Sequence, residues 1–306
     1  MNRRAAAAAD NASHDHANRA GILTMIGAMA CFIANDALVK YASQTMSTAQ
    51  LIFVRGVMAS TLVLGVARAM GATDRIREIA RGWVATRAVV DAAASVLFIV
   101  SLFHLPIGAA TAINMTSPLI ITVLAALIVG ERVGLPSWLA TGVGFVGVLL
   151  IIQPRSEAFN GYAIVCFIAT ILLSIRDLVT RRVHAAIPSI LVTLSTTVTV
   201  TVLSGAVVLI QGWNPLVPLD LVLLAVAAVF LAGGYYLLIN STRKGNISLV
   251  APFRYTGLLF ATAIGYVVWG DVPNALAWFG IVLLVGSGIY VLRASRRARA
   301  VAPTPD

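Results

Sequence analysis

Long apolar stretches, each about the length of a membrane-crossing helix, follow one another through most of this 306-residue chain. A transmembrane helix needs about 20 consecutive, mostly apolar residues. Ten such helices are predicted, at 20–42, 48–70, 81–103, 106–129, 135–153, 160–182, 188–210, 218–240, 247–269 and 275–293. Only 11% of the residues are charged, whereas about a quarter are charged in an ordinary soluble domain. The sequence therefore predicts an all-α integral membrane protein with ten transmembrane helices.

The second half of the chain repeats the layout of the first half at an offset of 140 residues. Asn114 then corresponds to Arg254 and Gly130 to Gly270, and polar breaks and apolar runs recur in the same order. Because an odd number of helices, five, separates the copies, the second copy is expected to lie upside down relative to the first. We expect two inverted five-helix repeats at 20–153 and 160–293, with tails at 1–19 and 294–306.

The basic residues predict how the chain is oriented in the membrane. If the N-terminus is cytoplasmic, sixteen of the 22 Lys and Arg fall in cytoplasmic segments and only Arg155 falls outside. Such a bias is typical of cytoplasmic loops. We therefore expect a bacterial-type inner membrane protein with both termini in the cytoplasm. The net charge of +10 is then a signal of membrane orientation, and we expect the lipid bilayer rather than nucleic acid as a partner.

Glycines gather in the fifth and tenth predicted helices, where small residues allow helices to approach closely. The pattern predicts tight packing within a monomer or across a homodimer. The glycines are Gly142, Gly144, Gly147, Gly280, Gly286 and Gly288.

Charged side chains within the predicted spans need partners or water, because a charge at the bilayer centre costs at least ~2.5–3.5 kcal/mol. Asp36 and Lys40 are four residues apart, so either they neutralise each other or Asp36 faces a substrate path. Arg87 and Asp91 have the same spacing, with Ser95 one turn further on.

Three more charges lie within the predicted spans. Arg55 has no acid three or four residues away, so its expected partner is Asp36 or Asp91. Arg176 and Asp177 are adjacent and point about 100° apart, so we expect them to satisfy each other poorly. They form either a cytoplasmic gate or an interfacial anchor. The residues assigned to structural charge pairs are Lys40, Arg55 and Arg87.

Asn114 and Arg254 occupy equivalent positions in the two predicted copies, and each has a proline nearby that frees a backbone carbonyl. An Arg without an acid within four residues can hold a carboxylate through two hydrogen bonds. The alternative for Arg254 is an ion pair with Asp177 or Asp91.

The sequence offers little for catalysis. The four His are in the N-terminal tail or near span ends, and Cys31 and Cys166 lie far apart. We therefore predict no catalytic, metal or cofactor site and no enzyme activity. Dispersed charges of both signs do not suit a channel filter, and the chain has no G-x-x-x-x-G-K motif of an ATPase.

Two stretches carry a family resemblance, namely Ala112…Pro118…Gly130-Glu131-Arg132…Trp138 and Ala251-Pro252-Phe253-Arg254-Tyr255…Gly265…Gly270-Asp271. In these stretches the chain resembles the EamA-type ten-helix branch of the drug/metabolite transporter superfamily, and YddG-type amino-acid exporters within it. The resemblance implies a secondary transporter with a central cavity between inverted repeats, which exports amino acids or related metabolites by alternating access. A carrier of drugs or of nucleoside- or sugar-like metabolites is the alternative. The implied cavity residues are Asn35, Asp36, Asp91, Asn114, Arg254 and Tyr255, to which we add Ser95 and Ser117.

Overall fold

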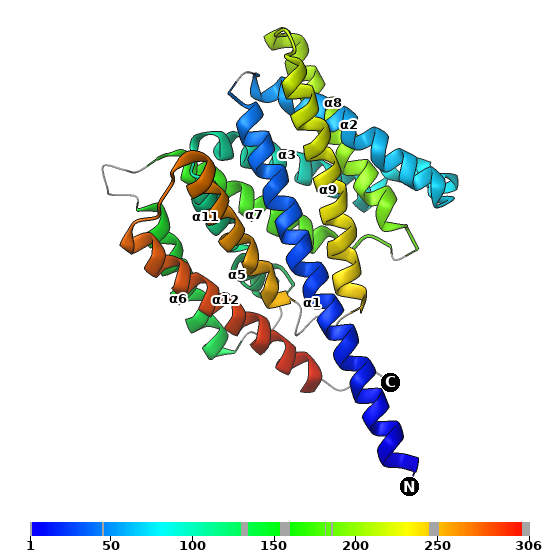
Figure 1. Ribbon diagram of the computed structural model, residues 1–306, viewed down its shortest axis with the longest axis vertical. Helices are drawn as coiled ribbons and strands as arrows, with labels where there is room; N and C mark the ends of the chain where they lie inside the picture. Colours follow the sequence, from blue (N-terminus) through cyan, green and yellow to red (C-terminus); the bar gives the residue numbers. More distant parts are fainter. Residues whose placement is uncertain are drawn as a thin grey trace.

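The computed structural model describes residues 2–44, 46–129, 134–153, 160–180, 182–184, 186–244 and 251–301 (Figure 1). Within these ranges every regular element is helical, which confirms the predicted all-helical fold. The elements are α1 (Asn2–Ala42), α2 (Thr48–Ala69), η1 (Ala72–Ala80), α3 (Gly82–His104), α4 (Ile107–Asn114), α5 (Ser117–Leu124), η2 (Ala125–Val129), α6 (Leu135–Ile152), α7 (Tyr162–Thr180), α8 (Ser189–Gln211), α9 (Pro218–Lys244), η3 (Ala251–Tyr255), α11 (Thr256–Trp269) and α12 (Ala275–Val301). The motif residues Gly130, Glu131 and Arg132 lie outside the described residues.

Eight stretches of the described chain are helical, long and apolar enough to cross a membrane, and Ala275–Val291 is a shorter apolar helix. Their outer faces carry large apolar side chains. Leu209 in α8 is 89% exposed and Val267 in α11 is 79% exposed. An apolar surface of this extent is unfavourable in water and suits lipid. The chain is a multi-pass membrane protein.

Helix α1 begins at Asn2, and the part of it apolar enough to cross a membrane, Arg19–Ala42, agrees with the predicted transmembrane helix at 20–42. The segment expected to be a solvated tail is therefore helical. Its run of alanines at 5–9 has the highest intrinsic helix propensity, which a prediction from hydropathy alone does not weigh.

Helices at equivalent places in the two halves of the chain pack against each other in opposite directions. Gly144 of α6 lies against Ser287 of α12, and Gly147 of α6 lies against Leu284 of α12. At the offset of 140 residues, Gly144 corresponds to Leu284 and Gly147 corresponds to Ser287, so each contact is the counterpart of the other. The α2–α8 contact also joins equivalent helices, and the α4–α11 contact joins the equivalent fourth and ninth spans. The α3–α7 contact is the counterpart of α1–α9. The packing thus has two-fold character.

The fourth apolar stretch is interrupted at Met115 and Thr116, between α4 and α5. Pro118 has no N–H to donate to the Asn114 carbonyl one turn earlier, so the helix loses a hydrogen bond at this point. The Thr116 hydroxyl instead donates to the carbonyl of Ile113 at 2.7 Å.

The second half has an irregularity at the equivalent position. The 3₁₀ helix η3 ends at Tyr255, and α11 begins at Thr256. The Thr256 hydroxyl donates to the Phe253 carbonyl at 2.6 Å, and these residues lie 140 positions after Thr116 and Ile113. The equivalent spans of the two halves are therefore interrupted at equivalent positions. In each of them a threonine hydroxyl donates a hydrogen bond to the carbonyl three residues earlier.

Candidate functional site

Six charged side chains from four helices form what we call the charge cluster. It contains three carboxylates and three guanidinium groups, so its formal charges balance. Its members are Asp36 in α1, Arg55 in α2, Arg87 and Asp91 in α3, and Arg176 and Asp177 in α7. The phenol of Tyr235 in α9 interacts electrostatically with Asp91 and all three arginines.

Arg176 joins the two halves of the chain. Its guanidinium donates to Asp91 of α3 at 2.9 Å and to its neighbour Asp177 at 2.7 and 3.0 Å. The expectation that Arg176 and Asp177 satisfy each other poorly is therefore wrong. A long Arg side chain can fold back along its own helix, so the 100° between the two positions does not keep the charged groups apart.

The predicted pair of Arg87 and Asp91 is present, at 3.5 Å, but Arg176 is the closer partner of Asp91. Arg87 also donates to the hydroxyls of Thr180 in α7 and Thr196 in α8, at 2.9 and 2.8 Å. Arg87 thereby ties α3 to two helices of the second half.

Of the two acids expected as partners for Arg55, Asp36 is the one that interacts with it. Asn35 donates to Asp36 at 2.9 Å, while its own amide oxygen is buried without a hydrogen-bond partner among the described residues. Asn35 thus leaves one acceptor for water or substrate.

Lys40 does not neutralise Asp36, because its chain extends toward the end of α1. Its ammonium donates to the carbonyl of Leu105 between α3 and α4, and it interacts with Asp271 after α11. It also lies over the ring of Trp269, at 5.0 Å from the centroid. We call these contacts the Lys40 latch; they join the two halves at the membrane face opposite the N-terminus of α1.

The broken fourth span places two predicted cavity residues beside α7. Asn114 is half-buried at the end of α4, and the structure records no hydrogen bond to its side chain within the described residues. The Ser117 hydroxyl lies 3.2 Å from that of Ser174 in α7. Ser95 in α3 is half-buried, one turn from Asp91.

Arg254 and Tyr255 lie in different surroundings, although they are neighbours. The side chain of Arg254 is exposed and forms no ion pair within the described part of the chain, where Asp91 and Asp177 are both bound to Arg176. The Tyr255 ring is 6% exposed and packs against Gly288 of α12. Its hydroxyl is buried without a partner among the described residues.

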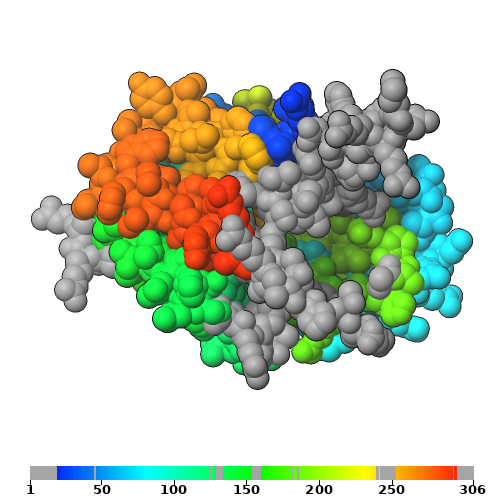
Figure 2. Space-filling view, turned by 90° about the horizontal axis from the view of Figure 1, so that it is seen from below, coloured from blue at the N-terminus to red at the C-terminus, as the bar shows by residue number. Residues whose placement is uncertain are grey.

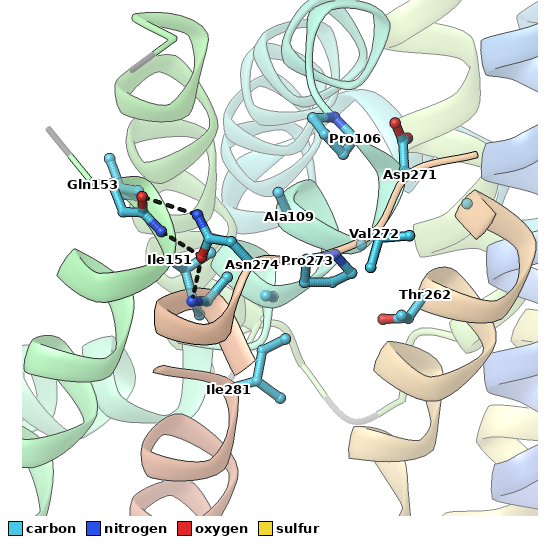
Figure 3. A pocket seen from close by; sticks show the side chains of 15 residues that line it. Pro106, Ala109, Ile151, Gln153, Thr262, Asp271, Val272, Pro273, Asn274 and Ile281 are labelled. Carbon is cyan, nitrogen blue, oxygen red and sulfur yellow. Dashed lines mark hydrogen bonds between the residues drawn. The ribbon is translucent and has the colours of Figure 1, made fainter. Parts of the chain in front are cut away.

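A cavity of about 280 Å³ lies at the same face as the Lys40 latch (Figure 3). The Asp271-Val272-Pro273 turn forms one side, and Ala109 of α4 lies opposite. Gln153 and Asn274 close one end through two reciprocal amide hydrogen bonds, at 2.8 and 3.1 Å (Figure 3). None of the eight predicted cavity residues lines it.

Sequence reasoning missed Thr180 and Thr196 as members of this polar region, and it left open whether Tyr235 and Tyr236 line a cavity or belong to the aromatic belt at the membrane interface. Tyr235 packs edge-on to Phe32 of α1, with 5.3 Å between ring centroids, whereas its neighbour Tyr236 is 69% exposed. Only one of the two tyrosines therefore suits a place in the lipid-facing belt. A helical projection of α9 is the sequence signal that distinguishes them.

A sequence model of the EamA-like transporter family matches residues 19–153 and matches again at residues 160–293. The chain belongs to the EamA-like transporter family. This confirms the resemblance to the drug/metabolite transporter superfamily. The EamA-like protein is a membrane transporter, with a small molecule as its substrate and the lipid bilayer around it.

Curated relatives of this EamA-like protein carry different substrate names. A riboflavin transporter of Rhizobium johnstonii is 28% identical over 69% of this chain and 70% of its own length. The pseudopaline exporter CntI of Pseudomonas aeruginosa is 27% identical over 91% of this chain and 98% of its own. An S-adenosylmethionine uptake transporter of Rickettsia conorii is 23% identical over 63% and 65%. One solved crystal structure matches 92% of this chain and 99% of its own, with a TM-score of 0.63 and 15% identity, which shows a common fold alone.

Proposed function

We propose that this protein is a secondary transporter that exports amino acids or related zwitterionic metabolites by alternating access. The ion pair between Asp91 of α3 and Arg176 of α7 carries the proposal, because it joins the two halves of the chain inside the membrane. Asp91 is 4% exposed and Arg176 is 18% exposed, so both charges are largely removed from water.

A substrate with both charges can replace this pair at the smallest cost. Breaking a buried ion pair by removing one partner costs about 3–5 kcal/mol, since the other charge stays uncompensated. An anion alone binds Arg176 and leaves Asp91 with only the more distant Arg87, at 3.5 Å. A zwitterion brings a carboxylate to Arg176 and an ammonium to Asp91. The balanced charge cluster therefore favours zwitterions over ions of one sign.

The moving parts are two inverted five-helix repeats of ten helices in all, at 20–153 and 160–293. The antiparallel contacts of equivalent helices support this arrangement, as does the double match of the family model. The basic residues favour both termini in the cytoplasm of a bacterial inner membrane, as a monomer or homodimer.

In this mechanism the two faces of the membrane are closed by different contacts. The Lys40 latch closes the outer face, and Arg176 with Asp177 forms the cytoplasmic gate. The breaks after Asn114 and Tyr255 are the points where the fourth and ninth spans bend. When the halves part, the substrate path is lined by Asn35, Asp36, Asp91, Ser95, Asn114, Ser117, Arg254 and Tyr255.

A second candidate is a carrier for another metabolite of the same fold. The relatives named for riboflavin, pseudopaline and S-adenosylmethionine favour it, and they also include both an exporter and an uptake transporter. Their names thus select neither substrate nor direction, and the choice rests on the charge cluster.

Counterflow into proteoliposomes, with and without a pH gradient, tests the proposal. Labelled zwitterionic amino acids should exchange, while their amides and their deaminated acids, each with a single charge, should exchange poorly. Arg254→Ala should weaken the apparent affinity for substrate; a wild-type rate and affinity would remove Arg254 from the path. Exchange of riboflavin but of no amino acid would favour the second candidate.

A further inference from the structure

An open apolar groove of about 370 Å³ lies on the outer surface between α2 and α8, away from the charge cluster. Val57 and Leu64 of α2 mark its length, about two helical turns or ~10 Å. Val202 of α8 lies along it and is 64% exposed, and Ile76 and Ile79 of η1 close one end. The groove thus runs from the membrane surface toward the interior, along the direction of an acyl chain.

The short helix η1 is fixed onto α8 rather than projecting into water. The Ser195 hydroxyl of α8 donates to the Ile79 carbonyl at 2.5 Å, and Arg75 donates to the Ala186 carbonyl at 3.0 Å. Ile79 packs with Leu191 and other buried apolar residues of α2 and α8. A segment with one apolar and one basic face, held at the end of a membrane helix, is typical of an element lying at the lipid headgroups.

Basic side chains gather at this end of the groove. The residues between Arg68 and Arg81 include four exposed arginines, Arg68, Arg75, Arg77 and Arg81, against two acids, Asp74 and Glu78. Figure 2 shows η1 and the end of α2, in cyan, at the edge of the face seen from the N-terminal side. An excess of Arg beside an apolar groove complements a negatively charged headgroup with its acyl chain.

We propose that this groove is a binding site for one anionic phospholipid. Its acyl chain lies along Val57, Leu64 and Val202, and its phosphate is bound by Arg75 and Arg77. Because α1 and α2 cross the membrane in turn, η1 is on the same side as the N-terminus, and the lipid belongs to that leaflet. Arg75 is already anchored by Ala186, so little side-chain entropy is lost when it binds the phosphate.

Native mass spectrometry of the purified full chain tests the site with phosphatidylglycerol and phosphatidylcholine of identical acyl chains. Wild-type protein should bind one phosphatidylglycerol more tightly than phosphatidylcholine. Replacing both Arg75→Gln and Arg77→Gln should weaken phosphatidylglycerol binding about tenfold or more, and should weaken phosphatidylcholine binding clearly less, because its choline cation already offsets the charge of the same phosphate. Val202→Trp, which fills the groove, should remove this binding event for both lipids.

Two substitutions of the same kind elsewhere serve as controls. Arg293→Gln removes an exposed Arg of α12, and Leu209→Trp enlarges an exposed side chain at the other end of α8. Both should keep wild-type lipid binding, and size-exclusion profiles should show that all variants are folded. Equal binding of the two lipids, or the same loss in the controls, would overturn the proposal.

Discussion

The guanidinium of Arg176 in α7 lies 2.9 Å from a carboxylate oxygen of Asp91 in α3, 85 residues earlier in the chain. This contact joins the two halves of the protein at a depth where water is scarce. Its partners explain why the cluster tolerates so many charges: Arg87 and Asp177 each contact one member of the pair, so no charge in this group of four stands alone.

Removing one member of this pair should destabilise the protein. We expect Asp91→Asn or Arg176→Gln to lower the free energy of unfolding by about 1.5–3 kcal/mol, because a hydrogen bond between charged groups is lost while Asp177 or Arg87 still contacts the remaining charge. The variant with both substitutions should lower the free energy of unfolding by clearly less than the sum of the two single effects. Chemical unfolding in detergent measures this, with the exposed Arg254→Gln as a control near zero. Additive losses would contradict a direct interaction.

Loss of the Lys40 latch should open the outer face. Ala109 lines the cavity at the same face as the latch, so an Ala109→Cys substitution, with Cys31 and Cys166 replaced by Ser, reports the accessibility of this cavity to an impermeant maleimide. A hydrogen bond to a charged group is worth about 1.5–3 kcal/mol, so Lys40→Met should raise the labelling rate about tenfold or more. Lys40→Arg, which keeps the charge and the donor, should change it little. An unchanged rate in Lys40→Met would show that the latch does not control this face.

The glycines of α6 and α12 should divide into two classes. A Cβ at Gly147 would lie 2.6 Å from the Gly280 carbonyl oxygen, whereas a Cβ at Gly142 or Gly286 would have no atom of another element within 4 Å. Gly147→Ala and Gly280→Ala should each lower the unfolding free energy by about 1–3 kcal/mol, as overpacking does. Gly142→Ala and Gly286→Ala are matched controls and should be neutral or slightly stabilising. Similar effects at all four positions would argue against this close crossing.

The break at Pro118 should matter more for transport than for stability. Pro118→Ala restores an N–H that can donate to the Asn114 carbonyl, so the unfolding free energy should rise by about 1 kcal/mol. A straighter fourth span should slow counterflow severalfold. Pro136→Ala, in the first turn of α6 where a proline costs no helix hydrogen bond, is the control. Unaltered counterflow in Pro118→Ala would remove this bend from the mechanism.

The inverted arrangement predicts opposite accessibility for equivalent loops. In the same Cys-free background, a cysteine at position 270 should react with an impermeant maleimide added outside intact cells. A cysteine at position 130 should react only after the membrane is made permeable. Reaction of both from one side would refute the inverted repeats. Arg19→Cys should behave like position 130 if the N-terminus is cytoplasmic.

Much of the helical framework follows from local properties of the sequence. Hydropathy predicts a helix at 48–70, and α2 extends over Thr48–Ala69. It also predicts the start at 275, where α12 begins. The predicted span at 20–42 agrees with the candidate span Arg19–Ala42, whereas the helical residues before it are not apolar and hydropathy does not report on them. The break at Met115 is indicated by Pro118, three residues later, and the matching irregularity at Tyr255 is indicated by Pro252, three residues earlier.

Charge pairing is where spacing along the sequence misleads. Spacing of four residues suggests that Lys40 neutralises Asp36, yet Lys40 donates to the Leu105 carbonyl and interacts electrostatically with Asp271, while Asp36 interacts with Arg55. The same reasoning separates Arg176 from Asp177, which are hydrogen-bonded. Long basic side chains can contact acids on neighbouring helices as well as on their own helix, so their partners depend on which helices lie nearby.

The sequence by itself determined that this chain crosses a membrane many times, that its halves repeat, and to which family it belongs. Apolar length and residue identity are local quantities that can be read along the chain. Only the tertiary structure decided that Arg176 binds Asp91, that Tyr255 is buried while Arg254 is exposed, and that Gly147 is crowded while Gly142 is free. These outcomes depend on which helices meet and at what rotation, and that is set by packing summed over the whole molecule.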